Sequence, residues 1–254
     1  MQTIFFTEFK RAIISWRFAL AAVGIPVTRL LGSTEMFTGD AVSTMIFSND
    51  LYEIAIAFAA LPFVADFAQS MAQKSYVPYV LRCGKNAYVV SKLLVLIFAT
   101  FLANMVGQTI YIGVLGMNEP LTLSAAESLN HLQFSAYFLG GSLYTGNPYP
   151  FFLGQILASG VVCVEFAVMS FLISVFCSSS LFVYATPFLL YLFSGYVFWS
   201  LGAPYYLVPS SIYEGWLTDS PLKDCVILFG HAAIVLTLFG GAFIYFARRR
   251  IADA

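Results

Sequence analysis

Two ionisable side chains stand inside long apolar runs of this sequence, and they are the first candidates for chemistry. Glu165 lies in the middle of VVCVEFAVMS, and His231 lies in LFGHAAIV. An ionised acid at the centre of a membrane helix costs about 2.5–3.5 kcal/mol, so the Glu165 carboxyl must face protein or water, or carry a proton. Glu165 is therefore interpreted either as part of a translocation or proton path or as a hydrogen-bonded packing residue. His231 is interpreted as a packed, hydrogen-bonded histidine.

The positions of these two residues argue against a direct pair. At 1.5 Å per residue, His231 lies about 9 Å and Glu165 about 22 Å from the outer end of its apolar run. We therefore expect the two side chains to lie at different depths.

The rest of the sequence contains no catalytic constellation. The only Gly-Lys, Gly84-Lys85, is followed by Asn86 and has no glycine five positions earlier, so a phosphate-binding loop is absent. Ser194-Gly195 lacks the first glycine of an intramembrane serine protease motif, and no Cys/His set has metal-ligand spacing. The sequence predicts a chain that is not an enzyme and carries no cofactor or metal of its own.

The composition indicates the elements that position these residues. Of the 254 residues, 60% are hydrophobic and 10% are charged, whereas soluble domains carry about 25% charged residues. The predicted fold is an all-α polytopic membrane protein with a single domain over residues 1–254. Six apolar runs are long enough to span a membrane: Ile13–Leu31, Asp50–Ala68, Leu93–Gly116, Pro150–Phe176, Leu181–Gly202 and Cys225–Ala247.

Charge gives the orientation of these six predicted spans. Ten of the twelve basic residues fall on the side that also holds both termini: Lys10, Arg11, Arg17, Lys74, Arg82, Lys85, Lys92, Arg248, Arg249 and Arg250. Arg29 and Lys223 are the exceptions, and Arg29 is expected to snorkel or to pair with Glu53 or Asp50. Lys/Arg bias marks the cytoplasmic side, so both termini are predicted to be cytoplasmic in a multi-pass protein of the cell membrane.

Two cytoplasmic segments stand out. The first, residues 69–92, contains the basic, tyrosine-rich run SYVPYVLRCGKNAYVVSK, which is either a surface helix or an ordinary positive-inside loop. The second is FFTEFKRAIISWRF at the N-terminus, which predicts an amphipathic interfacial helix, with the first turns of span one as the alternative. Its predicted apolar face is formed by Phe5, Phe9, Ala12, Ile13 and Trp16, with Glu8, Lys10, Arg11 and Arg17 mostly off that face.

This arrangement resembles the permease subunit of type-2 ATP-binding-cassette (ABC) exporters. The shared features are an amphipathic elbow helix, six spans, and a segment between spans two and three that ends in Tyr88-Val89-Val90-Ser91-Lys92 after Arg82. The resemblance implies a coupling helix that docks on separate ABC ATPase subunits, which hold ATP and magnesium. It also implies a second six-span permease, identical or related, surrounding membrane lipid, no nucleic-acid partner and a bacterial cell membrane. Family members often have an acidic residue a few positions after a Phe; here the nearest acid, Asp66, precedes Phe67.

The resemblance assigns roles to three groups of residues. The ATPase-coupling group is Gln69, Ser70, Met71, Gln73, Lys74, Ser75, Tyr76, Tyr79 and Arg82. The elbow-helix group is Phe9, Lys10, Arg11, Trp16 and Arg17, and Glu165 is assigned to the translocation path.

The predicted function is ATP-driven export of a hydrophobic substrate such as a peptide, lipid or antibiotic. One alternative is the substrate-capturing membrane subunit of an energy-coupling importer, which would lack the elbow and the long coupling segment. The other is an immunity or scaffold membrane protein without transport. The stretch Pro204–Pro221 is interpreted as a re-entrant piece or a surface loop, with Tyr205, Tyr206, Tyr213 and Trp216 in an outer aromatic belt. No role is predicted for the outer loop Met117–Tyr149.

Overall fold

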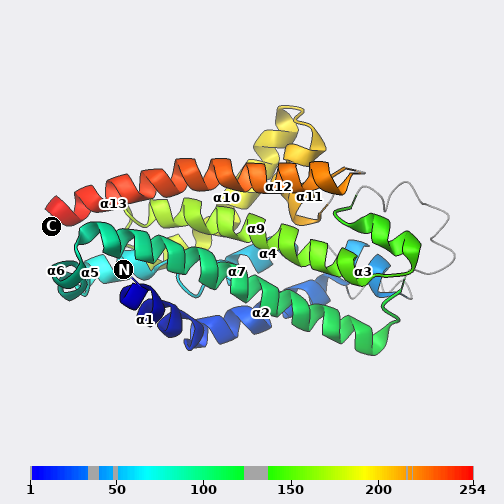
Figure 1. The fold of residues 1–254 in the computed structure, drawn as a ribbon, viewed down its shortest axis with the longest axis horizontal. Coiled ribbons are helices and arrows are strands. Elements are labelled where there is room, and N and C mark those ends of the chain that lie inside the picture. The colour runs from blue at the N-terminus through cyan, green and yellow to red at the C-terminus, as the bar shows by residue number, and fades with distance from the viewer. Residues whose placement is uncertain are drawn as a thin grey trace.

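In the computed structural model of the chain, long helices run along one common axis (Figure 1). The structure describes residues 2–33, 40–47, 51–122, 137–215, 217–218 and 220–253. Over these residues the regular elements are helices and none is a strand. The predicted all-α class is therefore confirmed for the part of the chain that is described.

Two helices form the centre of the bundle. These are α7 (Lys85–Asn118) and α9 (Tyr149–Ile173), both mostly buried. At the periphery lie α10 (Ser180–Ser200) and the last helical stretch, both mostly exposed although strongly apolar. That stretch consists of α12 (Pro221–Val235), a π-helical turn η4 (Leu236–Gly240) and α13 (Gly241–Asp253). The peripheral helices thus present apolar surface that the described part of the chain leaves exposed.

Among the described residues, four helices are long and apolar enough to cross a membrane: Lys85–Asn118, Tyr149–Ile173, Ser180–Ser200 and Pro221–Asp253. The number rises to five if Ile4–Ile13 and Trp16–Gly32, which meet at 53°, count as one span. The predicted second span, Asp50–Ala68, is not one helix. It consists of α4 (Tyr52–Ala60), a turn over residues 61–65, and α5 (Asp66–Ala72). Pro62 lies in this turn, where its missing N–H and its ring interrupt a regular helix.

The bend near the N-terminus has a local cause in one hydroxyl group. The two helices are α1 (Gln2–Ile13) and α2 (Trp16–Ser33), and Ser15 lies between them. Ser15 Oγ donates to the carbonyl of Ala12 at 2.6 Å and accepts from the N–H of Phe18 at 3.2 Å. The same side chain therefore caps the end of α1 and the start of α2.

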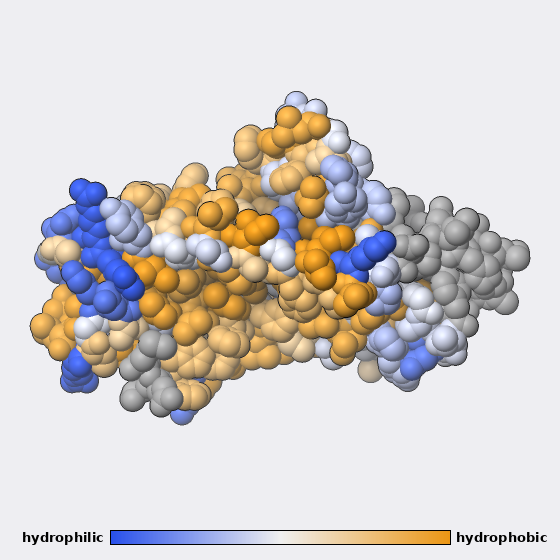
Figure 2. All heavy atoms as spheres, turned by 45° about the horizontal axis from the view of Figure 1, so that its top comes forward, coloured by the Kyte–Doolittle hydropathy of each residue, from blue (hydrophilic) through white to orange (hydrophobic). Residues whose placement is uncertain are grey.

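The surface is divided into an apolar belt and two more polar ends (Figure 2). Both termini lie at one end, together with α5 and α6 (Val77–Cys83) (Figure 1). The opposite end holds the short helix α3 (Ala41–Phe47), whose first turn is capped by Asp40 Oδ1 accepting from the Ser43 N–H at 2.8 Å. There Thr44 Oγ1 also donates to Glu119 Oε2 at 2.8 Å, which ties α3 to the end of α7.

The stretch before the last span packs back onto the bundle at this opposite end. It forms η3 (Tyr205–Leu207) and α11 (Pro209–Tyr213), and α11 packs on α9. The Gly215 carbonyl accepts from the Phe138 N–H at 2.7 Å, and a Cβ on Gly215, whose φ is +73°, would lie 2.4 Å from Gln155 Nε2. Only glycine fits this position.

The aromatic belt predicted for this stretch is partly wrong. Tyr213 is buried and its hydroxyl accepts from Gln108 Nε2 at 3.4 Å, because α11 turns inward. Tyr205 is exposed, and Trp216 lies outside the described residues.

The described part of the outer loop contains η2 (Gly140–Thr145), which follows Tyr137. Burial raises the pKa of the Tyr137 phenol, and the charge of Glu214 is a second cause. Residues 123–136 of the predicted outer loop also lie outside the described part.

Candidate functional site

A buried cluster of charges joins three helices at the end of the bundle that holds the termini. The Lys92 ammonium, on α7, donates to Glu8 Oε2 of α1 at 2.9 Å and to Asp66 Oδ2 of α5 at 2.5 Å. Lys92 and Glu8 are each 1% exposed, and Asp66 is 6% exposed. We call Glu8, Asp66 and Lys92 the ion cluster.

The composition of the ion cluster explains how three charges are tolerated in the interior. Burial of an isolated charge is strongly unfavourable, so buried charges occur paired and hydrogen-bonded. Arg11, mostly exposed, lies 3.7 Å from Glu8 and 3.9 Å from Asp66, so two cations face two carboxylates. The Lys92 ammonium also lies 5.1 Å from the centre of the Phe63 ring, within the range of a cation–π interaction.

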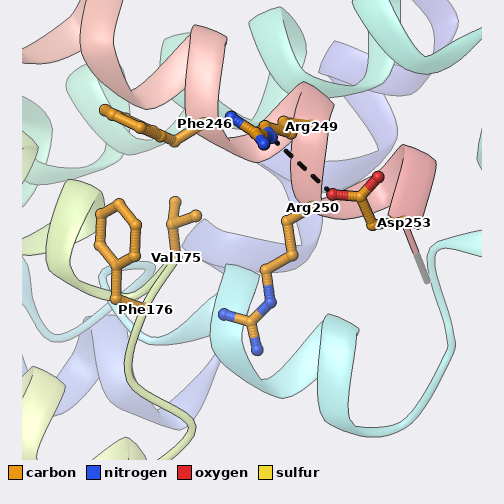
Figure 3. A pocket seen from close by; sticks show the side chains of 6 residues that line it. All are labelled: Val175, Phe176, Phe246, Arg249, Arg250 and Asp253. Atoms are coloured by element: carbon orange, nitrogen blue, oxygen red, sulfur yellow. Dashed lines mark ion pairs between the residues drawn. The ribbon is translucent and has the colours of Figure 1, made fainter.

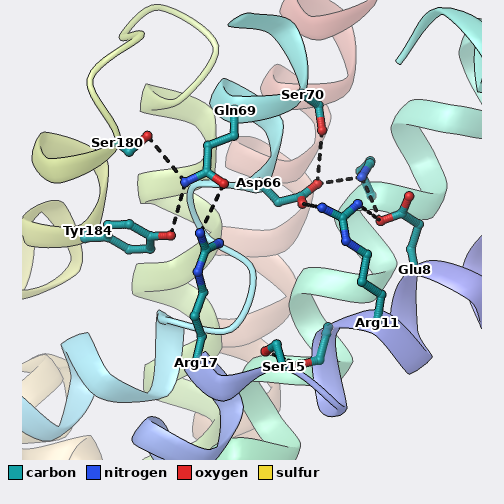
Figure 4. A network of polar contacts seen from close by, with 11 residues as sticks. Glu8, Arg11, Ser15, Arg17, Asp66, Gln69, Ser70, Ser180 and Tyr184 are labelled. Atoms are coloured by element: carbon teal, nitrogen blue, oxygen red, sulfur yellow. Dashed lines mark hydrogen bonds and ion pairs between the residues drawn. The ribbon is translucent and has the colours of Figure 1, made fainter. Parts of the chain in front are cut away.

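A second group of polar contacts continues from the ion cluster toward α10 (Figure 4). Arg17 Nη2 donates to Gln69 Oε1 at 3.2 Å, and Gln69 Nε2 donates to Ser180 Oγ and to Tyr184 Oη, each at 3.4 Å. Ser70, the neighbour of Gln69, donates to Asp66 Oδ2 at 3.4 Å. The base of α5 is thus connected to α1, α2, α7 and α10.

Between these anchors the chain forms a projecting segment, residues 69–86, at the end of the molecule. It consists of the last turn of α5, a turn over residues 73–76, α6, and the first residues of α7. Gly84, with φ +79°, ends α6 and allows α7 to start in a new direction. We call residues 69–86 the α5–α6 segment.

The nine residues predicted for ATPase coupling divide by exposure. Gln73, Lys74, Ser75 and Arg82 are exposed at the tip of the α5–α6 segment. Ser70 and Tyr76 are buried, and Gln69 points into the network described above. Met71 and Tyr79 are partly buried against the core, and the Tyr79 ring stacks on Tyr88 at 6.2 Å.

The predicted face of the N-terminal helix requires correction. The buried residues of α1 are Ile4, Glu8 and Ala12, which recur every four positions, so Glu8 lies on the packed face. Phe9 packs against the core at the edge of that face, whereas Lys10 and Arg11 are exposed. Trp16, predicted on the apolar face, is 71% exposed because the chain bends at Ser15 before it. Arg17 is partly buried, and its guanidinium lies over Tyr184 at 5.6 Å.

Two further basic residues are placed differently from the prediction. Lys92 is predicted in a cytoplasmic loop, but α7 begins eight residues earlier than the predicted span and encloses it. Arg29 is 4% exposed, and its guanidinium lies 5.2 Å from the centre of the Tyr111 ring. This burial argues against the expected snorkelling; the other prediction, a pair with Glu53 or Asp50, stays a prediction, because Asp50 lies outside the described residues.

The second candidate site lies midway along the bundle, and there the predicted separation of Glu165 and His231 is wrong. His231 Nδ1 lies 2.9 Å from Oε1 and 3.0 Å from Oε2 of Glu165. At 1.5 Å per residue, Glu165 is about 24 Å from the start of α9 and His231 about 15 Å from the start of α12. These two distances would place Glu165 and His231 at different depths only if α9 and α12 began at the same level of the bundle. α9 begins further out than α12 (Figure 1), so the two residues meet.

The Glu165–His231 pair borders an apolar pocket between α7, α9 and α12. Its volume is about 210 Å³, and its lining residues are Ile97, Phe98, Phe101, Val161, Val164, Glu165, Phe229, Ala232 and Leu236. Leu236 begins the π-helical turn η4, and π-helical turns inside α-helices are frequent at functional sites. The carboxyl group of Glu165 is the one ionisable group in this lining.

Both sites are built from ion pairs and hydrogen bonds between helices. Within the described part of the chain, no three His, Cys, Asp or Glu side chains are grouped to hold a metal ion. Comparison with protein-family models, with curated proteins and with solved structures gives no match. The assignment of function therefore depends on the geometry of this chain.

Sequence reasoning missed the ion cluster, although one signal for it was available. Tyr88, Lys92 and Leu96 recur every four residues, and a lysine between two large residues on one helical face indicates a buried or snorkelling cation. Asp66 directly follows the buried run from Phe63 to Ala65. A carboxylate at such a position is a candidate partner for the buried Lys92 ammonium.

Proposed function

We propose that this chain is the membrane-spanning subunit of an ATP-driven exporter similar to the type-2 ABC permeases. One observation carries the proposal: the α5–α6 segment has an exposed tip, while its base is fixed by buried charges to α1 and α7. A loop that only satisfies the positive-inside rule needs no such anchor. A segment that transmits force from a partner protein does.

The anchor supplies the mechanical connection that the mechanism needs. Lys92 holds Asp66, at the start of α5, on one side and Glu8 of α1 on the other. Displacement of the tip by an ATPase subunit would thus move α1 and α7 together with α5. The ATPase holds ATP and magnesium, and this chain contributes the contact surface.

The proposal includes six spans and an orientation. The spans are α2, α4 with α5, α7, α9, α10, and α12 with α13, while α1 lies in the interface as the elbow helix. The end with the termini carries Lys10, Arg11, Lys74, Arg82 and Arg248 through Arg250, so it faces the cytoplasm by the positive-inside rule. The chain would lie in the cell membrane of a bacterium.

The substrate path in this proposal is apolar. The pocket beside Glu165 has an apolar lining apart from the carboxyl group, which favours a hydrophobic substrate such as a peptide, lipid or antibiotic. The exposed apolar faces of α10 and of α12 with α13 leave room for a second permease, identical or related. Two such chains would enclose the path together.

The test compares Arg82→Ala and Arg82→Lys with the wild-type chain. Each tagged chain is purified from its native host membranes, co-purified P-loop ATPase is identified by mass spectrometry, and ATP hydrolysis is measured. Arg82 is exposed at the tip, and its planar guanidinium can bind a carboxylate through two N–H groups, which lysine cannot. Both variants should insert normally and lose about 10- to 150-fold in ATPase affinity, as expected for roughly 1.5–3 kcal/mol.

Lys10→Ala is the matched control, because Lys10 is an exposed cation at the same end of the molecule but on α1. It should retain the ATPase at the wild-type level. Wild-type chain that carries no P-loop ATPase, or that transports as a monomer, contradicts the proposal. Normal retention in both Arg82 variants would move the docking contact to other residues of the tip.

A further inference from the structure

A pocket beside α13, separate from the ion cluster and from Glu165, combines basic and apolar walls (Figure 3). Its volume is about 450 Å³, and it is lined by Val175, Phe176, Phe246, Arg249, Arg250 and Asp253. We call it the α13 pocket. A neighbouring pocket on another face of α13, lined in part by Lys85 and Arg248, shares Arg249 with it.

The basic wall contains a donor that the described residues do not satisfy. Nη1 of Arg250 is buried and has no hydrogen-bond partner among the residues that the structure describes; the same holds for Nε of Arg248, which lines the neighbouring pocket. Arg249 differs, since its Nε lies 4.0 Å from Asp253 Oδ2 and both side chains are mostly exposed. In Figure 3 Arg250 extends away from that pair. Buried donors are normally satisfied, so the Arg250 guanidinium calls for an acceptor from outside the chain.

The apolar wall determines what kind of acceptor fits. Phe176, in the turn after α9, and Phe246, on α13, meet edge to face with ring centres 5.2 Å apart. Phe176 is 66% exposed. A small anion would satisfy the arginine and leave these rings in water, whereas an amphiphile would cover both walls.

The place of the pocket along the bundle matches an amphiphile. α13 continues the last apolar span and carries Arg248, Arg249 and Arg250 near its C-terminal end. The hydrophilic end meets the apolar belt at this level (Figure 2). Membrane lipid has its phosphate at such a boundary, and basic residues just beyond a span attract anionic lipid.

We propose that the α13 pocket binds the headgroup of an anionic phospholipid. Its phosphate oxygens accept hydrogen bonds from the Arg250 guanidinium, and the upper part of its acyl chains lies on Phe176 and Phe246. This assignment is independent of the proposed export function, because it concerns the lipid around the chain and not a transported substrate.

The test uses the full chain in neutral detergent, titrated with phosphatidylglycerol or with phosphatidylcholine that has the same acyl chains. Native mass spectrometry counts bound lipid, and the thermal midpoint is followed in parallel. Phosphatidylglycerol should remain bound and raise the midpoint, and phosphatidylcholine should not. Arg250→Gln should weaken phosphatidylglycerol binding about tenfold, the loss expected for one charge-assisted contact, while the control Lys223→Gln, an exposed cation at the opposite end of the bundle, should not.

Two additional arms separate the possible occupants. Phe176→Ala should weaken the binding of phosphatidylglycerol. It should leave any change of the thermal midpoint with inorganic phosphate unaltered, since only the lipid contacts the apolar wall. If inorganic phosphate raises the thermal midpoint as much as phosphatidylglycerol does, the pocket is a simple anion site and the lipid proposal is wrong. If a polyglutamate peptide raises it as much, the pocket binds an acidic protein partner instead.

The remaining outcomes are equally decisive. Arg250→Gln is checked for folding by circular dichroism and by its thermal midpoint in phosphatidylcholine, both of which should match wild type because Nη1 of Arg250 has no hydrogen-bond partner among the described residues. Equal binding of the two lipids to wild type, or wild-type lipid affinity in correctly folded Arg250→Gln, overturns the proposal.

Discussion

His231 Nδ1 lies 2.9 Å from Glu165 Oε1, a contact between α12 and α9 that connects residues 66 positions apart in the sequence. Glu165 is 1% exposed, so this imidazole is the partner that satisfies its carboxyl group. Removal of a partner leaves a buried polar group with its full desolvation penalty.

The first prediction concerns this pair. His231→Ala should lower the free energy of unfolding by about 1–3 kcal/mol, because the Glu165 carboxyl loses its hydrogen bond. His231→Asn should cost less, because the asparagine amide can donate from nearly the same place as Nδ1. Thermal unfolding in detergent measures both, and equal midpoints for the two variants would show that the hydrogen bond contributes little.

The second prediction concerns the ion cluster. Lys92→Met leaves Glu8 and Asp66 facing each other without their shared cation, and it should cost about 3–5 kcal/mol in the free energy of unfolding. The triple variant Glu8→Gln, Asp66→Asn, Lys92→Met should recover much of that loss, because it removes the buried charges together. Lys10→Met serves as the exposed control. A triple variant no more stable than Lys92→Met would mean that shape, and not charge, dominates at this place.

The third prediction compares two glycines of α7. A Cβ on Gly107 would lie 2.7 Å from Ile25 Cβ of α2, whereas a Cβ on Gly113 meets nothing within 4 Å. Gly107→Ala should therefore destabilise the chain by about 1–3 kcal/mol through overpacking. Gly113→Ala should be neutral or stabilising, by up to about 1 kcal/mol, because alanine favours a helix. The opposite order of thermal midpoints would contradict the close approach of α2 and α7.

The fourth prediction tests orientation across the membrane. α7 has 34 residues, and it is about 51 Å long, more than the apolar core of a bilayer. With Cys83→Ser, Cys177→Ser and Cys225→Ser as background, which removes the native cysteines that are not buried, Ser75→Cys before α7 should be labelled by an impermeant thiol reagent only from the cytoplasmic side. Asn118→Cys, at the other end of α7, should be labelled only from outside. Labelling of both from the same side would exclude α7 as a span.

Composition and apolar run length were enough to predict the all-helical class and most of the long helices. They could not predict the break in Asp50–Ala68, since a 19-residue apolar run looks the same whether it is one helix or two short ones around Pro62. The contacts of the ion cluster were also out of reach. Lys92 pairs with Glu8 and Asp66, which are 84 and 26 positions away, and only the packing of α1 and α5 on α7 brings them together. Glu165 and His231 were separated by an assumption about helix ends, because helix offset along a bundle leaves no mark in one sequence.

The π-helical turn over Leu236–Gly240 has a consequence for how this protein can change over evolutionary time. A π turn closes its hydrogen bonds over five residues instead of four, so it holds one residue more than the α turn that it replaces. Loss of that residue would restore a regular α turn and leave the rest of the helix in nearly the same rotation, whereas a deletion in a regular α-helical part of the span would rotate everything after it by about 100°. Arg250 would therefore stay on the side of α13 where Phe246 and Phe176 lie. This turn is a place where related chains could gain or lose one residue and still keep the proposed lipid pocket aligned with the membrane.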